Sequence, residues 1–116
     1  MTQLEAARSG QITAQLRQVA EAEGLPIEQV LGVVATDRAV IPANSTYTLP
    51  SPRGVGKGLT TKVNANIGTS VHYPDVETEV EKLLTAVEAG ADAVMDLSTG
   101  GNLREIRARI REACPV

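Results

Sequence analysis

Two similar segments, residues 62–68 and 92–101, most constrain what this chain of 116 residues can fold into. Each combines apolar residues with polar residues near its end, and each is followed by hydrophobic residues at helical spacing. This pattern predicts strands over residues 59–67 and 91–97. It predicts helices from Pro74 to a cap at Gly90 and over residues 102–113. The two strands should be parallel, because a crossover helix returns the chain to the same end of the sheet.

The N-terminal half is dominated by helical patterns. Spacing and cap residues predict helices over residues 2–9, 12–23 and 26–35, with Thr2 and Glu5 forming a capping box. A strand-like run at residues 39–41 precedes a stretch rich in glycine and proline, residues 43–58, which we expect to be a long loop. The predicted fold class is α/β, with an N-terminal helical region at residues 1–58 and two βα units at residues 59–116.

Alternation along the first predicted strand separates its side chains into two faces. One face carries Val63, Ala65 and Ile67, which the helices should cover. The other face carries Lys62, Asn64 and Asn66, whereas both faces of a buried parallel strand are ordinarily apolar. Two interpretations remain open: a strand face exposed to solvent, or a site where Asn64 or Asn66 holds a polar ligand.

The second predicted strand divides in the same way. One face carries Val94, Asp96 and Ser98, and the other carries Ala93, Met95 and Leu97. On pattern alone Met95 is a packing residue. Asp96 can be interpreted as a base, a hydrogen-bond acceptor or a partner for Lys62. Residues 98–102 lead into a helix and can be either an anion site or a plain strand-to-helix turn with Asn102 as N-cap.

Charged residues are expected on the outer faces of the two C-terminal helices. The helix after Pro74 has one apolar stripe, with its glutamates, including Glu79, elsewhere; the stripe is Val76, Val80, Leu83, Leu84 and Val87. The last helix alternates arginines with Glu105 and Glu112, which is typical of a solvated face. The net charge is −3 and the chain has two aromatic residues, so no nucleic-acid partner is expected.

Cysteine and histidine are too few for a metal site built from this chain alone. Cys114 and His72 are the single representatives of their types, so the chain cannot supply a structural zinc site or an iron–sulfur cluster. We expect His72 to be an exposed loop residue and Cys114 to be incidental. No apolar run approaches the roughly 20 residues of a membrane span. The first residues lack the order of a signal peptide, so the expected location is cytoplasmic.

Four segments resemble a known family. Residues 62–68, K-V-N-A-N-I-G, and residues 94–100, V-M-D-L-S-T-G, look like the signature segments of the phosphomethylpyrimidine synthases, which are radical S-adenosylmethionine enzymes of thiamine biosynthesis. Residues 2–8 and 40–44 are similar to two further family segments, in the same order along the chain. Residues 56–62, Thr69, Ser70 and the Gly100–Gly101 pair are equally similar to a sister branch, the 5-hydroxybenzimidazole synthases.

The resemblance implies a fold and a site. The family has a (β/α)8 barrel after an N-terminal region, and it rearranges aminoimidazole ribotide with a 4Fe-4S cluster, S-adenosylmethionine and a further divalent metal. The family's substrate contacts include positions that correspond to Asn66 and Met95, which become the predicted substrate-binding residues. A homodimer is expected for the full-length family.

The resemblance also implies what is missing. The remaining substrate contacts, the metal-binding histidines and the C-terminal C-x2-C-x4-C cluster motif have no counterpart here, so no catalytic, cofactor or metal ligand is assigned. Two of eight βα units leave the barrel incomplete. We therefore expect a fragment, a truncated gene product or a piece of a split protein. The alternatives are a module that self-associates through open strand edges, and a phosphate-binding domain using residues 98–102.

Overall fold

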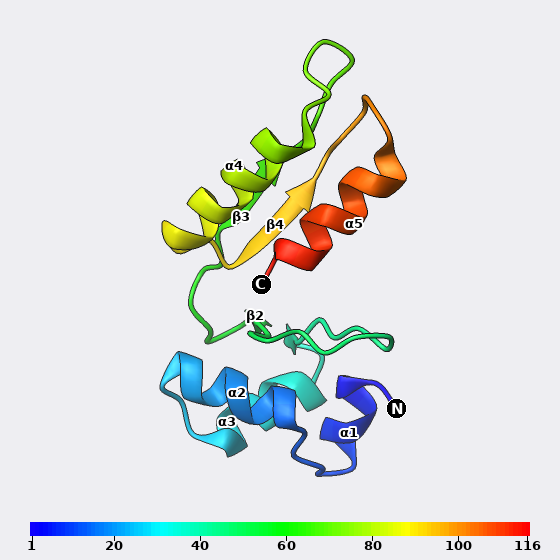
Figure 1. Cartoon of the computed structure of the whole chain (residues 1–116). Coiled ribbons are helices and arrows are strands. Elements are labelled where there is room, and N and C mark those ends of the chain that lie inside the picture. Colours follow the sequence, from blue (N-terminus) through cyan, green and yellow to red (C-terminus); the bar gives the residue numbers. More distant parts are fainter. The chain divides into compact units, whose positions relative to one another are not determined.

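The structure is a computed structural model that describes all 116 residues, and it divides into two units, Met1–Thr61 and Lys62–Val116 (Figure 1). The first unit contains α1 (Gln3–Arg8), α2 (Ala14–Glu23), α3 (Ile27–Ala35), β1 (Ala39–Val40) and β2 (Val55–Gly56). The second contains β3 (Asn64–Ile67), α4 (Val76–Glu88), β4 (Ala93–Asp96) and α5 (Leu103–Ala113). The predicted α/β class is confirmed at this level.

Predicted caps are present at the start of α1 and at the end of α2, whereas α2 begins two residues later than predicted, after Thr13 as N-cap. Thr2 Oγ1 accepts from the amide of Glu5 at 3.1 Å, and Glu5 Oε2 accepts from the amide of Thr2 at 2.7 Å, so the capping box is present. Gly24 ends α2 in the left-handed conformation at φ 65°. The three helices bury one core; its buried members are Ala7, Leu16, Val19, Ala20, Val30, Val34, Ala39 and Ile41.

The predicted loop at residues 43–58 contains a strand that the sequence pattern missed. Val55–Gly56 forms β2 and pairs antiparallel with β1, with Ala39 opposite Gly56 and Val40 opposite Val55. A Cβ on Gly56 would lie 2.4 Å from the Ala39 Cα, so only glycine allows this close approach. The strand has two residues and one glycine, which is too short for alternation to indicate it.

The second unit contains the predicted parallel pair. β3 and β4 pair in parallel over four residues each, from Asn64 opposite Ala93 to Ile67 opposite Asp96. Both strands are shorter than predicted. Leu59 packs against the core of the first unit, and Thr60 bonds Glu23 there, so this part of the predicted strand belongs to the first unit instead.

Both helices of the second unit pack against one side of the β3–β4 pair. Their common core contains Ile67, Leu83, Ile106 and Ile110, with Val94 partly buried against it, and α4 lies beside α5 (Figure 1). The opposite side, which we call the open face, has no covering element within this unit. It consists of Asn64, Asn66, Ala93, Met95 and Leu97, all exposed.

The predicted apolar stripe of α4 is wrong at two positions. Leu84 is 50% exposed, whereas Glu79, which was expected on the polar face, is 2% exposed.

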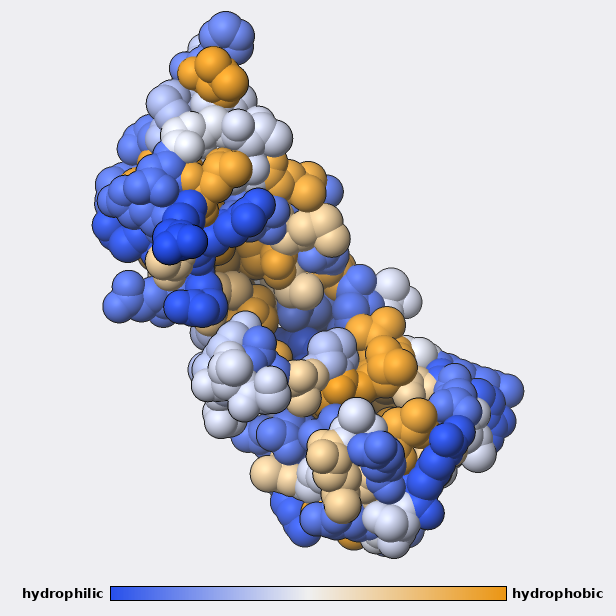
Figure 2. Space-filling view, turned by 90° about the vertical axis from the view of Figure 1, so that its right-hand side faces the viewer, coloured by the Kyte–Doolittle hydropathy of each residue, from blue (hydrophilic) through white to orange (hydrophobic).

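Figure 2 shows hydrophobic surface, in orange, beside hydrophilic surface, in blue. The large exposed hydrophobic residues of the second unit are Val63, Val71, Tyr73, Leu84, Met95 and Leu97.

The sheets do not form a closed barrel. Each has two strands, β1–β2 in one and β3–β4 in the other. The second unit has the strand–helix order and the parallel pairing of βα units, but two strands cannot close a cylinder.

Candidate functional site

The register of the parallel pair places Asn66 directly opposite Met95. Both residues lie on the open face, and Met95 is 49% exposed. Met95 therefore does not pack in the core of its unit, which overturns the interpretation from pattern alone. Asn66 and Met95 stand near the carboxyl ends of their strands, where parallel sheets carry ligands.

Asn64 orients the Asn66 side chain. The Asn64 Nδ2 donates to Asn66 Oδ1 at 2.9 Å, along the same strand face. This bond engages the Asn66 oxygen, so the group that it leaves for a ligand is the Nδ2, which can donate two hydrogen bonds. Asn66 and Met95 together thus offer a fixed donor beside a polarisable thioether.

Asp96 lies on the opposite side of the sheet, under the helices. Its Oδ1 accepts from the amide and from the hydroxyl of Ser98, and its Oδ2 lies 3.9 Å from the Nε of Arg107. Its side chain is 14% exposed, and Oδ2 is buried without a hydrogen bond. Asp96 is therefore an acceptor that shapes the turn after β4. Of the interpretations that the sequence left open for Asp96, the structure favours the hydrogen-bond acceptor, and Asp96 does not share a face with Asn66 and Met95.

Beyond the strands, residues 68–70 and 97–100 form what we call the strand-end clasp. The Leu97 amide donates to the Ile67 carbonyl at 2.8 Å and the Thr99 amide to the Thr69 carbonyl at 2.9 Å, which continues the parallel ladder. Side chains add to it: the Thr69 amide donates to Ser98 Oγ at 3.1 Å, and Thr69 Oγ1 donates to the Gly100 carbonyl at 2.6 Å.

Two glycines of the strand-end clasp are explained by close backbone approach. A Cβ on Gly68 would lie 2.6 Å from the Leu97 carbonyl carbon, and one on Gly100 would lie 2.3 Å from the Ser70 carbonyl carbon. Asn102 caps α5 by accepting from the Glu105 amide at 3.4 Å. The amides of Ser98 and Thr99 already have partners within the chain. Residues 98–102 therefore form a strand-to-helix turn with Asn102 as N-cap, in which the amides of Ser98 and Thr99 are not free to bind an anion.

Glu79 is the residue of this region that sequence reasoning missed. From α4 its Oε2 accepts from the Gly68 amide at 2.7 Å, and its Oε1 accepts from Lys82 Nζ at 2.7 Å. A signal was present: Glu79 lies three residues after Val76 and four before Leu83, so it occupies the apolar side of the helix.

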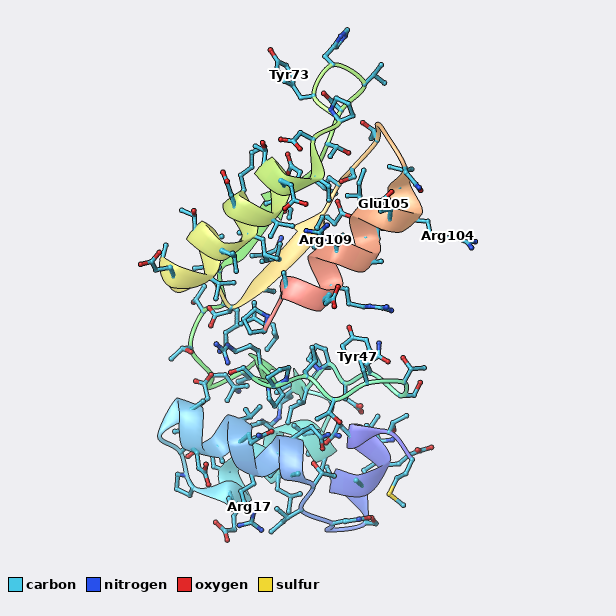
Figure 3. All side chains as sticks on the ribbon, viewed as in Figure 1. Arg17, Tyr47, Tyr73, Arg104, Glu105 and Arg109 are labelled. Carbon is cyan, nitrogen blue, oxygen red and sulfur yellow. The ribbon has the colours of Figure 1, made fainter.

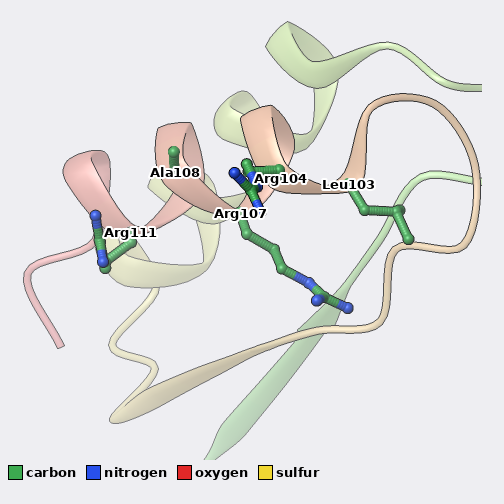
Figure 4. Close-up of a pocket in the computed structure, with 5 residues that line it drawn as sticks. All are labelled: Leu103, Arg104, Arg107, Ala108 and Arg111. Carbon is green, nitrogen blue, oxygen red and sulfur yellow. The ribbon is translucent and has the colours of Figure 1, made fainter.

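A basic hollow of about 530 Å³ lies on α5 (Figure 4). Its lining residues are Leu103, Arg104, Arg107, Ala108 and Arg111. Arg109 instead reaches α4, where its Nη2 lies 2.7 Å from Glu77 Oε1, while Arg104 extends outward (Figure 3). The arginines of α5 are exposed, as predicted for a solvated face.

The residues present do not fit a cluster or a metal. No group of three or more His, Cys, Asp or Glu side chains is arranged to hold an ion. His72 is exposed, and Cys114, half-buried against the core of its unit, donates from Sγ to the Val116 carbonyl at 3.1 Å. None of the helices has the length and apolar character needed to cross a membrane.

A parallel βα pair with an amide and a thioether on its open face defines an α/β chain with a candidate small-molecule site. The chain belongs to the radical SAM ThiC family, whose family model matches residues 2–116. It is 52% identical to the phosphomethylpyrimidine synthase of Moorella thermoacetica over 115 residues, 99% of this chain and 27% of that protein. With the Thermus thermophilus phosphomethylpyrimidine synthase it shares 56% identity over 117 residues, 100% of this chain and 27% of that protein. The chain thus spans about a quarter of the length of these relatives.

Proposed function

We propose that this chain forms the N-terminal part of a phosphomethylpyrimidine synthase and supplies one corner of its substrate site. The enzyme is a radical S-adenosylmethionine lyase that converts aminoimidazole ribotide to the hydroxymethylpyrimidine phosphate of thiamine. The observation that supports the proposal is the pairing of Asn66 with Met95 on the open face. The second unit would then be the first two βα units of a (β/α)8 barrel, with the open face turned toward the barrel interior.

In this role each side chain has its own task. The Asn66 Nδ2 would donate to an oxygen or ring nitrogen of the ribotide, because its own oxygen is already bonded to Asn64. Met95 would contact the flat imidazole ring, since thioethers pack favourably against aromatic systems. Together they bind and orient the substrate without moving a proton.

The remaining groups would come from outside these residues. A 4Fe-4S cluster, S-adenosylmethionine and a divalent metal would be held by parts of the enzyme beyond this chain, whose own residues do not form a ligand set. A homodimer and a cytoplasmic location are part of the same proposal. The sister reaction, formation of 5-hydroxybenzimidazole from the same substrate, would use the same two residues.

The test is an exchange of segments. This chain replaces the matching segment of the Moorella thermoacetica enzyme, to which it is 52% identical, and product formation from aminoimidazole ribotide is measured without oxygen. We expect the chimeric enzyme to be active. We expect Asn66→Ala to lower kcat/KM by about 10- to 100-fold, the effect of one lost hydrogen bond in an enclosed site, and Met95→Ala to lower it by a similar factor.

The matched control is Ala93→Ser, which changes the open face at the other end of β4. It should leave kcat/KM within about 2-fold, because Ala93 stands at the amino end of β4, away from the carboxyl end where the substrate is proposed to bind. If Asn66→Ala and Met95→Ala both behave like this control, the two residues do not contact the substrate and the proposal fails.

A second candidate is a non-catalytic module that self-associates. The open face exposes Met95 by 49% and Leu97 by 52%, and unpaired strand edges invite pairing with another copy. Light scattering across a range of concentrations decides this: assembly that Leu97→Lys abolishes would support it, and a monomer at all concentrations would exclude it.

A further inference from the structure

The buried polar residues of this chain gather at one place. The structure buries three polar or charged side chains, Thr69, Glu79 and Ser98, and all three belong to the strand-end clasp or bond to it. Burying polar groups costs free energy unless each finds a partner, and here each does. The chain therefore concentrates its internal polar network directly beyond Asn66 and Met95.

Glu79 is the charged member of this network. It lies in the first turn of α4, 2% exposed, and its two oxygens have separate partners. Oε2 accepts from the Gly68 amide at 2.7 Å, a charge-assisted bond to the backbone where β3 ends. Oε1 accepts from Lys82 Nζ at 2.7 Å, and the Lys82 side chain is 53% exposed. Gly68 stands two residues after Asn66.

We propose that Glu79 is a positioning residue that sets the direction of Asn66 relative to Met95. The Glu79 carboxylate accepts from the Gly68 amide on the helix side of the sheet. This bond fixes the direction of the backbone where it leaves β3. The neighbouring Ile67 carbonyl is then aligned to accept from the Leu97 amide at 2.8 Å. Asn66 lies one residue before Ile67, and Met95 lies two residues before Leu97, so both are close to this hydrogen bond. The expected effect on substrate binding rests on the proposed function. The effect of Glu79 on the position of Asn66 concerns this chain alone.

Three variants in the chimeric enzyme separate positioning from stability. Glu79→Met keeps the volume and removes the acceptor, Glu79→Gln keeps one oxygen for the Gly68 amide, and Lys82→Met removes the ion partner and leaves the Gly68 bond. We expect Glu79→Met to raise KM for aminoimidazole ribotide about 10-fold, because small displacements of binding groups weaken a site strongly. Glu79→Gln should stay within about 3-fold, since the carboxamide oxygen still accepts from the amide.

Lys82→Met is the matched control. It leaves the buried carboxylate without its cation and should lower the melting temperature while KM stays within about 2-fold. A purely structural role of Glu79 predicts instead that KM follows the melting temperature through all three variants, and that result would overturn the inference.

Nuclear magnetic resonance of this 116-residue chain tests the geometry without any reaction. In Glu79→Gln, a neutral acceptor replaces the charged one, so the Gly68 amide proton should shift upfield, and the Asn66 Nδ2 protons should shift with it. A Gly68 shift with unmoved Asn66 resonances would overturn the proposal even if Glu79→Met fails to fold. If Asn66→Ala leaves catalysis unchanged, the proposed function fails while this measurement still decides the positioning. If Asn66→Ala is harmful and Glu79→Met is not, the positioning alone fails.

Discussion

At the residue scale, the tightest constraint lies at Gly100. A Cβ at this position would meet the Ser70 carbonyl carbon and oxygen, both at 2.3 Å, and the Val71 amide nitrogen at 2.5 Å. These are backbone atoms, which cannot rotate away as a flexible side chain can. The glycine is therefore required by the approach of the two loops in the strand-end clasp.

Replacing Gly100 by Ala should lower the free energy of unfolding of the second unit by about 1–3 kcal/mol or more, because the added methyl overpacks a closed contact. The matched control is Gly32→Ala in α3, where a Cβ would meet no atom within 4 Å. That change should stabilise its helix by about 0.5–1 kcal/mol. Urea denaturation followed residue by residue measures both. Equal effects at the two positions would contradict the steric explanation.

At the element scale, side-chain caps define where four of the helices begin. Thr2, Thr13, Asp75 and Asn102 accept backbone hydrogen bonds at the starts of α1, α2, α4 and α5. Asp75 Oδ2 accepts from the Thr78 hydroxyl at 2.5 Å and Oδ1 from the Glu77 amide at 3.2 Å. The Thr78 hydroxyl, followed by the Glu77 amide, lowers the pKa of the Asp75 carboxyl below its ordinary 3.8.

This cap should make the start of α4 sensitive to acid. Because the pKa of Asp75 is lower in the folded chain than in the unfolded chain, its stabilisation is present above pH 3.8 and is lost as pH falls through the lower folded value. The Glu77 and Thr78 amide resonances, followed from pH 6 downward, should move as the cap is protonated. Asp75→Asn keeps the acceptor and should abolish this transition. Glu5→Gln is the control for the other acid-sensitive cap, because the pKa of Glu5 is also lowered, chiefly by its hydrogen bond with the Thr2 backbone. This variant should keep the transition at Glu77 and Thr78. An unchanged transition in Asp75→Asn would assign it to another group.

At the scale of the whole molecule, each unit has its own core, and the second unit closes its sheet on one side. Leu83 is 0% exposed between α4 and the sheet, whereas Leu84, the next residue, is 50% exposed. In Lys62–Val116 the helices cover one side of the sheet, and the other side, the open face, is exposed. That arrangement suits a sheet whose second side receives a ligand or a further part of the protein.

The two adjacent leucines test this one-sided packing. Leu83→Ala should lower the free energy of unfolding of the second unit by about 2–5 kcal/mol through the cavity that it leaves. Leu84→Ala, with the same change one position along, should cost less than about 1 kcal/mol, since half of the side chain is exposed. Hydrogen exchange at the amides of β3 and β4 measures both. A comparable loss from Leu84→Ala would show that the outer side of α4 is also covered.

The sequence by itself determined the features that depend on neighbouring residues. The caps at Thr2, Asp75 and Asn102 need partners within three positions, and the parallel pair follows from strand–helix order. Alternation separated Asn66 from the apolar side chains of its strand, and four short segments were enough to indicate the family. The register of the two strands, not the pattern, put Met95 beside Asn66.

Only the tertiary structure decided the features whose partners come from other elements. Val55 became a strand residue because Val40 lies beside it, and Glu79 is buried because the Gly68 amide reaches it from the end of β3. Helical spacing from Val76 and Leu83 indicates which side of α4 Glu79 occupies, but a buried carboxylate is stable only where a donor from another element satisfies it, and no local pattern encodes that donor.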